Sequence, residues 1–212
     1  MALSGVQKTV LVTVAVVALV IGATVNKVLR PAPLDQAQLT EAGVYLFDSP
    51  RVIPDIQLTS AKAQSWGKSD LEGHWNLLFF GYTFCPDICP TTMAELRQLT
   101  LNLPEEERQQ LQVTMISVDP HRDTPEQMNS YLEFFKAGFN GATGEPAELA
   151  KLAQGLSVAY IEPDTSEDNY LVDHSGQVVM VDPQGRYVGF IRPPLRPAQL
   201  GELLPRIMAQ AD

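Results

Sequence analysis

Cysteine and histidine are scarce in this sequence. Its 212 residues include two cysteines, Cys85 and Cys89, and three histidines. Two thiolates are too few to close a four-cysteine metal site, and they cannot form a network of disulfides. The chain does not need such a network, because a protein of this length with 45% hydrophobic residues can bury a core of its own.

Basic charge is also scarce beyond the N-terminus. The chain has 15 basic and 25 acidic residues, and residues 1–30 contain three of the basic ones and no acidic one. The rest of the chain is therefore strongly acidic. Because binding to phosphate groups needs a basic face, the sequence argues against a nucleic-acid partner.

The N-terminus contains the longest apolar run. Residues 9–25 are 17 residues without a charge, bracketed by Lys8 and Lys27. As a helix they would extend about 26 Å, and lysines at the ends can cover the difference from a hydrocarbon core of roughly 30 Å. A cleaved signal peptide is the alternative, but its apolar region is usually shorter. We expect an uncleaved transmembrane anchor over 9–25, after a short segment 1–8.

A polar, proline-containing segment follows the apolar run. It has no helical or strand periodicity, so we expect residues 26–43 to be a tether and residues 44–212 to form one folded domain.

Within this domain, strand and helix patterns alternate. Strands are expected at Val44–Phe47, Ile56–Leu58, Leu77–Tyr82, Val113–Val118, Gln177–Val181 and Tyr187–Ile191. Apolar stripes at helical spacing lie near residues 93–103, 128–135, 147–154 and 200–207, and Thr124 and Gln127 suggest a capping box before the second of these. This order predicts an α/β protein with a mixed sheet, a thioredoxin-like fold with an N-terminal β extension.

Both cysteines lie in the segment GYTFCPDICP, between a buried strand and the start of a helix. The free N–H groups and the dipole at a helix start favour an anion, so we expect the pKa of at least one thiol to be lowered. Four residues apart in a helix, the two Cβ atoms would be close enough to share a metal ion or, after a small adjustment, to form a disulfide.

An inert structural disulfide is a further alternative. Cys85 and Cys89 would close a very short loop, however, and the stabilisation from closing so short a loop is small. The sequence therefore favours reactive thiols over a structural cross-link.

A metal site would need a third ligand, which the histidines could supply. His74 lies in a polar turn and His121 among charged loop residues, so surface roles are favoured for both. His174 instead interrupts an apolar stretch, in YLVDHSGQVVMVD, before the expected hairpin. Two thiolates and an imidazole suit a soft or borderline ion, and copper is favoured over zinc, which normally takes four protein ligands in a structural site.

Three segments, GYTFCPDICP, SVDPHRDTPE and YLVDHSGQVVMVDPQG, together resemble the signature segments of the Sco/SenC family. The resemblance covers about residues 67–207 and includes the anchor and tether in front. It implies a membrane-anchored copper protein of cytochrome c oxidase assembly, with its soluble domain in the bacterial periplasm or, alternatively, the mitochondrial intermembrane space.

Carried over residue by residue, the resemblance makes Cys85, Cys89 and His174 the ligands of one copper per domain, as Cu(I) and also Cu(II). It places Asp87, Asp173, Asp119 and Arg122 beside these ligands or facing a partner, and Pro86 and Pro90 shape the loop. His121 departs from the family pattern, which often has an acidic residue there.

Two mechanisms remain open. A metallochaperone would receive copper from a donor protein and pass it to the binuclear copper centre of oxidase subunit II. A thiol-disulfide reductase would use Cys85 and Cys89 to reduce a disulfide in that subunit. His174 distinguishes the two, because only the first requires it as a ligand.

Overall fold

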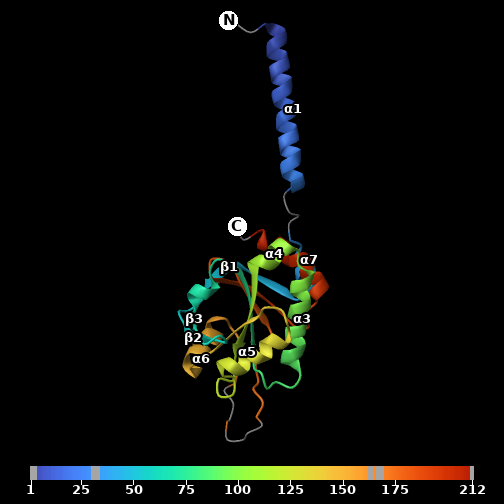
Figure 1. Cartoon of the computed structure of the whole chain (residues 1–212). Helices are drawn as coiled ribbons and strands as arrows, with labels where there is room; N and C mark the ends of the chain where they lie inside the picture. The colour runs from blue at the N-terminus through green and yellow to red at the C-terminus, as the bar shows by residue number, and fades with distance from the viewer. Residues whose placement is uncertain (1–3, 30–33, 162–164, 166–169, 211–212) are drawn as a thin grey trace. The chain divides into compact units, whose positions relative to one another are not determined.

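The computed structural model describes residues 4–29, 34–161, 165 and 170–210 (Figure 1). The chain divides into two compact units, residues 1–33 and 34–212. In the first unit, the helix α1 (Gly5–Leu29) contains a stretch, Gly5–Gly22, that is long and apolar enough to cross a membrane. None of this stretch is buried against protein, as expected for a membrane anchor.

The second unit begins earlier than expected. A short helix, α2 (Gln36–Glu41), lies inside the predicted tether, and the carboxylate of Asp35 accepts a hydrogen bond from the N–H of Ala37. Leu39 and Ala42 are buried in the domain core. The tether prediction is therefore wrong for residues 34–43. Leu39 and Ala42 are too few to give a visible helical period in the sequence, yet their burial is enough to hold this six-residue helix on the domain. Residues 30–33 lie outside the described part of the chain.

In the described residues, the domain is built on one mixed sheet of eight strands, which confirms the expected α/β class. In spatial order the strands are β1 (Val44–Val52), β8 (Arg186–Ile191), β7 (Val178–Val181), β4 (Trp75–Gly81), β5 (Leu111–Ser117), β6 (Asn140–Thr143), β2 (Gln57–Ser60) and β3 (Ser65–Gly67). The strands β4, β5 and β6 run parallel, and the other neighbours pair antiparallel. All residues of β4 are buried, as its continuous apolar sequence predicts.

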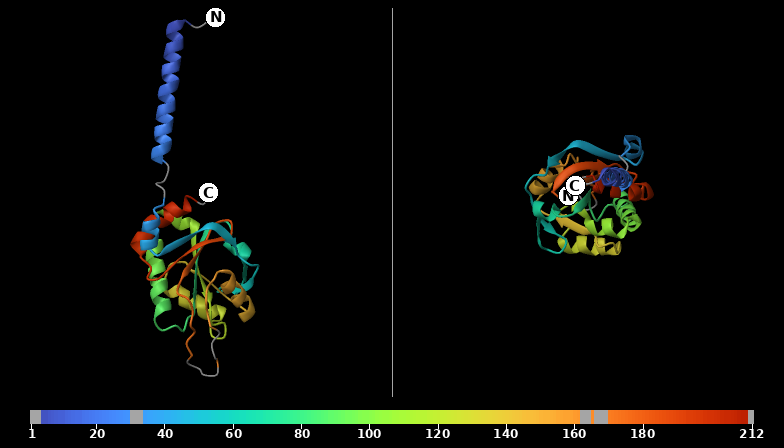
Figure 2. Two further views of the ribbon diagram at one scale, coloured as in Figure 1. Left: turned by 180° about the vertical axis from the view of Figure 1, so that it is seen from behind. Right: turned by 90° about the horizontal axis from the view of Figure 1, so that it is seen from above.

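Helices cover the sheet and connect its strands. They are η1 (Lys68–Leu71, a 3-10 helix), α3 (Ile88–Asn102), α4 (Glu105–Gln110), α5 (Pro125–Phe134), α6 (Pro146–Gly155) and α7 (Pro197–Met208). The apolar stripe of α3 is fully buried at Met93, Leu96 and Leu99. The helices α3 and α7 lie side by side (Figures 1 and 2), and α5 packs on β6.

The predicted capping box at α5 is only half formed. The hydroxyl of Thr124 accepts a hydrogen bond from the N–H of Gln127, as expected. The side chain of Gln127 does not return to the cap; its amide donates to the hydroxyl of Thr83 in the cysteine loop. The start of α5 is thereby tied to the segment that leads to the thiols.

Parallel pairing of β4 with β5 puts two loops at the same end of the sheet. Gly81 ends β4 opposite Ser117, which ends β5. The loop after β4 contains the cysteines, and the loop after β5 contains Asp119, Arg122 and Asp123. Sites in open α/β sheets usually lie at this carboxyl end.

Candidate metal centre

The two cysteines occupy different environments at the start of α3. Cys89 lies in the first helical turn and is fully buried, whereas Cys85 precedes the helix and is half-buried. The N–H of Cys89 donates to Sγ of Cys85 over 3.4 Å. The segment between them is therefore a bend leading into a helix rather than a helical turn, and the sulfur of Cys85 lies at the free N–H groups of the helix start.

His174 lies beside Cys89. Its Nε2 is 3.7 Å from Sγ of Cys89, and its Nδ1 is 3.1 Å from the carbonyl oxygen of Ser175. Because a carbonyl oxygen can only accept, Nδ1 carries the proton and the lone pair of Nε2 faces the sulfur. A hydrogen bond from the second ring nitrogen to a carbonyl is the usual way in which a ligating histidine is oriented.

Backbone pairing holds the segment around His174 in place. His174 forms a β-bridge with Tyr160, and hydrogen bonds from Ile161 to Asp173 and from Ser175 to Ala159 flank the bridge. In the sequence, residues 156–161 are no more than a largely apolar stretch. Its function as the pairing partner of the histidine segment depends on contacts distant in the sequence.

Burial sets the protonation of both groups. It lowers the pKa of His174, which favours the neutral imidazole that can bind a metal. It raises the pKa of the Cys89 thiol well above its usual range, and the nearby sulfur of Cys85 acts in the same direction. For Cys89 this is the opposite of the lowering expected at a helix start, because desolvation outweighs the helix dipole. A cation that binds there must displace the thiol proton.

The predicted ligand set is brought together in part. In the described portion of the chain, no three His, Cys, Asp or Glu side chains are already arranged to hold a metal ion. Cys89 and His174 converge, and Cys85 lies in the same loop with its sulfur directed at the N–H of Cys89. The donor types, two sulfurs and one imidazole nitrogen, fit Cu(I), and completing the set requires the half-buried Cys85 side chain to adjust.

Asp119 and Arg122 form a compact cluster with Tyr170. The fully buried Asp119 accepts hydrogen bonds from Nε of Arg122 over 2.5 Å and from the Tyr170 hydroxyl over 2.7 Å. The guanidinium of Arg122 lies 3.6 Å from the ring centroid of Tyr170 and 5.0 Å from that of Phe84. The cluster links the cysteine loop, the loop after β5 and the histidine segment. Asp119 is therefore internal and does not face a partner.

The carboxylate beside this cluster, Asp123, was not among the predicted site residues. It is fully buried, and its oxygens accept hydrogen bonds from the N–H and hydroxyl of Thr83 and from the hydroxyl of Ser117. Burial raises its pKa. The sequence shows that Asp123 follows a predicted strand and directly precedes the Thr124 cap. That position could have marked it as a candidate site residue, because sites in open α/β sheets lie at the carboxyl ends of parallel strands.

The other two predicted carboxylates are exposed. Asp87 lies at the N-cap position of α3 but its side chain makes no capping hydrogen bond, and Asp173 is exposed beside His174. His121 is exposed in the loop after β5, where the sequence placed it.

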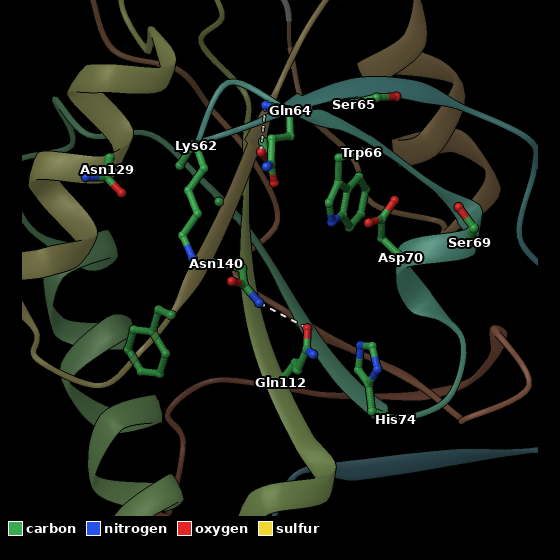
Figure 3. Close-up of a pocket in the computed structure, with 14 residues that line it drawn as sticks. Lys62, Gln64, Ser65, Trp66, Ser69, Asp70, His74, Gln112, Asn129 and Asn140 are labelled. Atoms are coloured by element: carbon green, nitrogen blue, oxygen red, sulfur yellow. Dashed lines mark hydrogen bonds between the residues drawn. The ribbon is translucent and has the colours of Figure 1, made fainter.

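His74 lies at the other end of the sheet, in a polar cavity of about 410 Å³. The starts of β5 and β6 line this cavity through Gln112 and Asn140, which are hydrogen-bonded to each other (Figure 3). Nε2 of His74 is buried and, among the described residues, has no hydrogen-bond partner. Neither cysteine lines this cavity, which lies at the end of the sheet opposite the thiols.

Comparisons with known proteins find relatives in both sequence and fold. The model of the SCO1/SenC family matches residues 47–209. A candidate copper-binding protein of Stutzerimonas stutzeri is 42% identical over 172 residues, which are 81% of this chain and 84% of that protein. The structure of Bradyrhizobium japonicum ScoI with copper bound has a TM-score of 0.66 at 32% identity, covering 73% of this chain and 98% of that chain. The structure of Arabidopsis thaliana ScoI with copper bound has a TM-score of 0.69 at 29% identity, covering 76% of this chain and 99% of that chain.

Proposed function

The chain belongs to the SCO1/SenC family, and from this membership we propose that it is a membrane-anchored copper metallochaperone. Its copper would go to the binuclear copper centre of cytochrome c oxidase subunit II. The observation that carries the proposal is the approach of Nε2 of His174 to Sγ of Cys89, with the other ring nitrogen bonded to Ser175. Disulfide exchange needs only the two thiols, whereas a copper ion bound by two thiolates needs an imidazole oriented in this way as its third ligand.

In this proposal Cys85, Cys89 and His174 bind one copper per domain, as Cu(I) and also Cu(II). Copper bound by two thiolates and an imidazole keeps an open coordination position, so an incoming thiolate from the acceptor can bind before Cys85 releases it. Of the two thiolates, Cys85 is the better placed to exchange, because it is half-exposed whereas Cys89 is buried. The copper would come from a separate donor protein.

The apolar helix at the N-terminus supports a location at a membrane. The helix α1 fits a membrane anchor by length and composition. We place it in a bacterial inner membrane with the copper domain in the periplasm; the mitochondrial inner membrane, facing the intermembrane space, is the alternative. Mass spectrometry of the membrane-bound protein tests whether the anchor is retained, because a protein whose leader has been cleaved would lack the peptide that contains Lys8.

A thiol-disulfide reductase is the second candidate. The observation in its favour is that both thiols are free, with Cys85 half-exposed at a helix start and Cys89 buried behind it. In this mechanism the Cys85 thiolate attacks a disulfide of subunit II, releasing one thiolate of that subunit. Cys89 then attacks Cys85 of the mixed disulfide, so the chain is oxidised by two electrons and the subunit reduced by two.

One pair of assays separates the candidates. The full chain in lipid nanodiscs is loaded with Cu(I) and mixed with reduced, copper-free subunit II domain, and copper transfer is followed. The metal-free reduced chain is separately mixed with disulfide-oxidised subunit II, and new thiols are counted. Under the chaperone proposal His174→Ala impairs copper transfer and leaves disulfide reduction unchanged; a variant that still transfers copper at the parent rate contradicts it.

A further inference from the structure

Large apolar side chains are exposed around the thiols. Phe84 precedes Cys85 and is 49% exposed, Ile88 precedes Cys89 and is 44% exposed, and Leu171 precedes the buried Val172 and is 68% exposed. They belong to one end of the domain, because Phe84 lies over Arg122, whose guanidinium stacks on Tyr170 next to Leu171. Exposed apolar groups gathered at one place indicate an interaction site rather than chance exposure.

Two carboxylates lie among these apolar residues. Asp87 and Asp173 are exposed, and neither forms a salt bridge in the part of the chain that the structure describes. Arg122, which stacks on Tyr170 in the same cluster, is already paired with Asp119, and its side chain is only 18% exposed. The surface formed by Phe84, Ile88, Leu171, Asp87 and Asp173, called the site rim below, is therefore apolar and negatively charged.

These properties restrict what can cover the site rim. A second copy of the chain docked symmetrically would bring Asp87 and Asp173 against the same carboxylates, which is repulsive in a desolvated interface. An anionic lipid surface is disfavoured for the same reason. A protein with an apolar contact loop flanked by lysine or arginine matches both the apolar area and the charge.

We propose that the site rim is the docking surface for the copper acceptor, and that the acceptor presents apolar residues flanked by basic ones next to its own metal ligands. This deepens the proposed function and rests on it. Ile88 and Leu171 supply contact area on the two sides of the ligands, and Asp87 and Asp173 steer the basic acceptor towards them.

The test uses the full chain in nanodiscs and the soluble domain of subunit II as the probe. Binding is measured by surface plasmon resonance and copper transfer by stopped flow, each at low and high salt. Ile88→Ser with Leu171→Ser should weaken binding and slow transfer roughly tenfold, as for the loss of two central interface contacts. Asp87→Asn with Asp173→Asn should lower the association rate and its dependence on salt.

Matched controls are Val52→Ser and Leu101→Ser, which remove exposed apolar side chains outside the site rim. They should leave binding and transfer unchanged, and every variant should keep the parent copper affinity. Unchanged binding in both rim variants overturns the proposal, as does faster association when the carboxylates are removed. The proposal is also overturned if sedimentation shows that the parent self-associates and that the rim variants do not. If the parent binds subunit II through the rim but transfers no copper, the docking surface stands and the metallochaperone proposal fails.

Discussion

The two ends of the central sheet differ in how their polar side chains are arranged: one end surrounds an open cavity, and the other packs its polar groups against one another. At the amino end of β4, β5 and β6, an open polar cavity contains His74 with Nε2 lacking a hydrogen-bond partner among the described residues. At the carboxyl end, Cys89 and His174 are packed against each other, and Asp119 and Asp123 are fully hydrogen-bonded. The proposed copper site lies at the carboxyl end and not in this cavity, because a single metal ion needs convergent ligands rather than volume.

The largest difference between the ends is expected in copper binding when a sulfur is replaced. Cys89→Ser exchanges a soft thiolate for a hydroxyl of similar size, so Cu(I) affinity should fall at least about a hundredfold. Affinity is measured by competition with a chromophoric chelator under anaerobic conditions. Ser69→Ala, at the polar cavity, is the matched control and should bind copper like the parent. Full affinity in Cys89→Ser would remove Cys89 from the ligand set.

The carboxyl end should also lose more stability when a carboxylate is neutralised. Asp119→Asn leaves Arg122 without its buried partner, and we expect the free energy of unfolding to fall by about 3 kcal/mol. Asp70→Asn, at the cavity, weakens one hydrogen bond that the N–H of Gly67 donates to an exposed carboxylate, and should cost about 1 kcal/mol or less. Urea denaturation measures both; equal losses would mean that the Asp119 cluster adds no special stability.

The sequence predicts some elements of this fold better than others. The α/β class and the alternation of β4, α3, β5 and α5 were predictable, because buried strands and amphipathic helices have clear periods. The short strand β6 was not, since Asn140 and Gly141 have low strand propensity and are held by pairing with β5 and β2.

The residues of the proposed site could be named from the sequence, but their geometry could not. Cys85, Cys89 and His174 are rare residues in suggestive places, and the resemblance of their segments joined them. Tyr170 and Asp123 were missed, because a tyrosine in an apolar stretch and an aspartate before a helix cap each have ordinary explanations. Only the fold shows that Tyr170 reaches Asp119 across 51 positions. The rise in the Cys89 pKa was likewise invisible, since desolvation depends on what packs around the sulfur.

Close packing at the carboxyl end makes Gly81 a sensitive position. A Cβ at Gly81 would lie 2.7 Å from Cε1 of Phe79 and 3.1 Å from Sγ of Cys89. Gly81→Ala should therefore lower the free energy of unfolding by about 2 kcal/mol and weaken copper binding, as overpacking displaces the sulfur. Gly138→Ala has open space around its Cβ and serves as the comparison for a loop glycine, although its positive φ gives it a cost of its own. An unchanged copper affinity in Gly81→Ala would show that the sulfur tolerates displacement.

The smallest effect concerns a single hydroxyl. Tyr170→Phe removes the hydrogen bond to Asp119 and should cost about 1 kcal/mol. Tyr131→Phe is the matched control: its hydroxyl is buried, has no hydrogen-bond partner among the described residues, and should be removed at no cost. Thermal unfolding of the two variants side by side gives the comparison, and a larger loss in Tyr131→Phe would contradict it.

The central claim is that copper binds at the carboxyl end through His174 and not at the cavity through His74. The direct measurement is the Cu(I) affinity of His174→Ala and His74→Ala in the full chain, together with the Cu(II) electron paramagnetic resonance spectrum of each. We expect His174→Ala to bind Cu(I) about ten- to a hundredfold more weakly and to lose the nitrogen hyperfine signature, since it removes one of three ligands. His74→Ala should match the parent in both. A parent-like His174→Ala, or a loss confined to His74→Ala, would contradict the assignment.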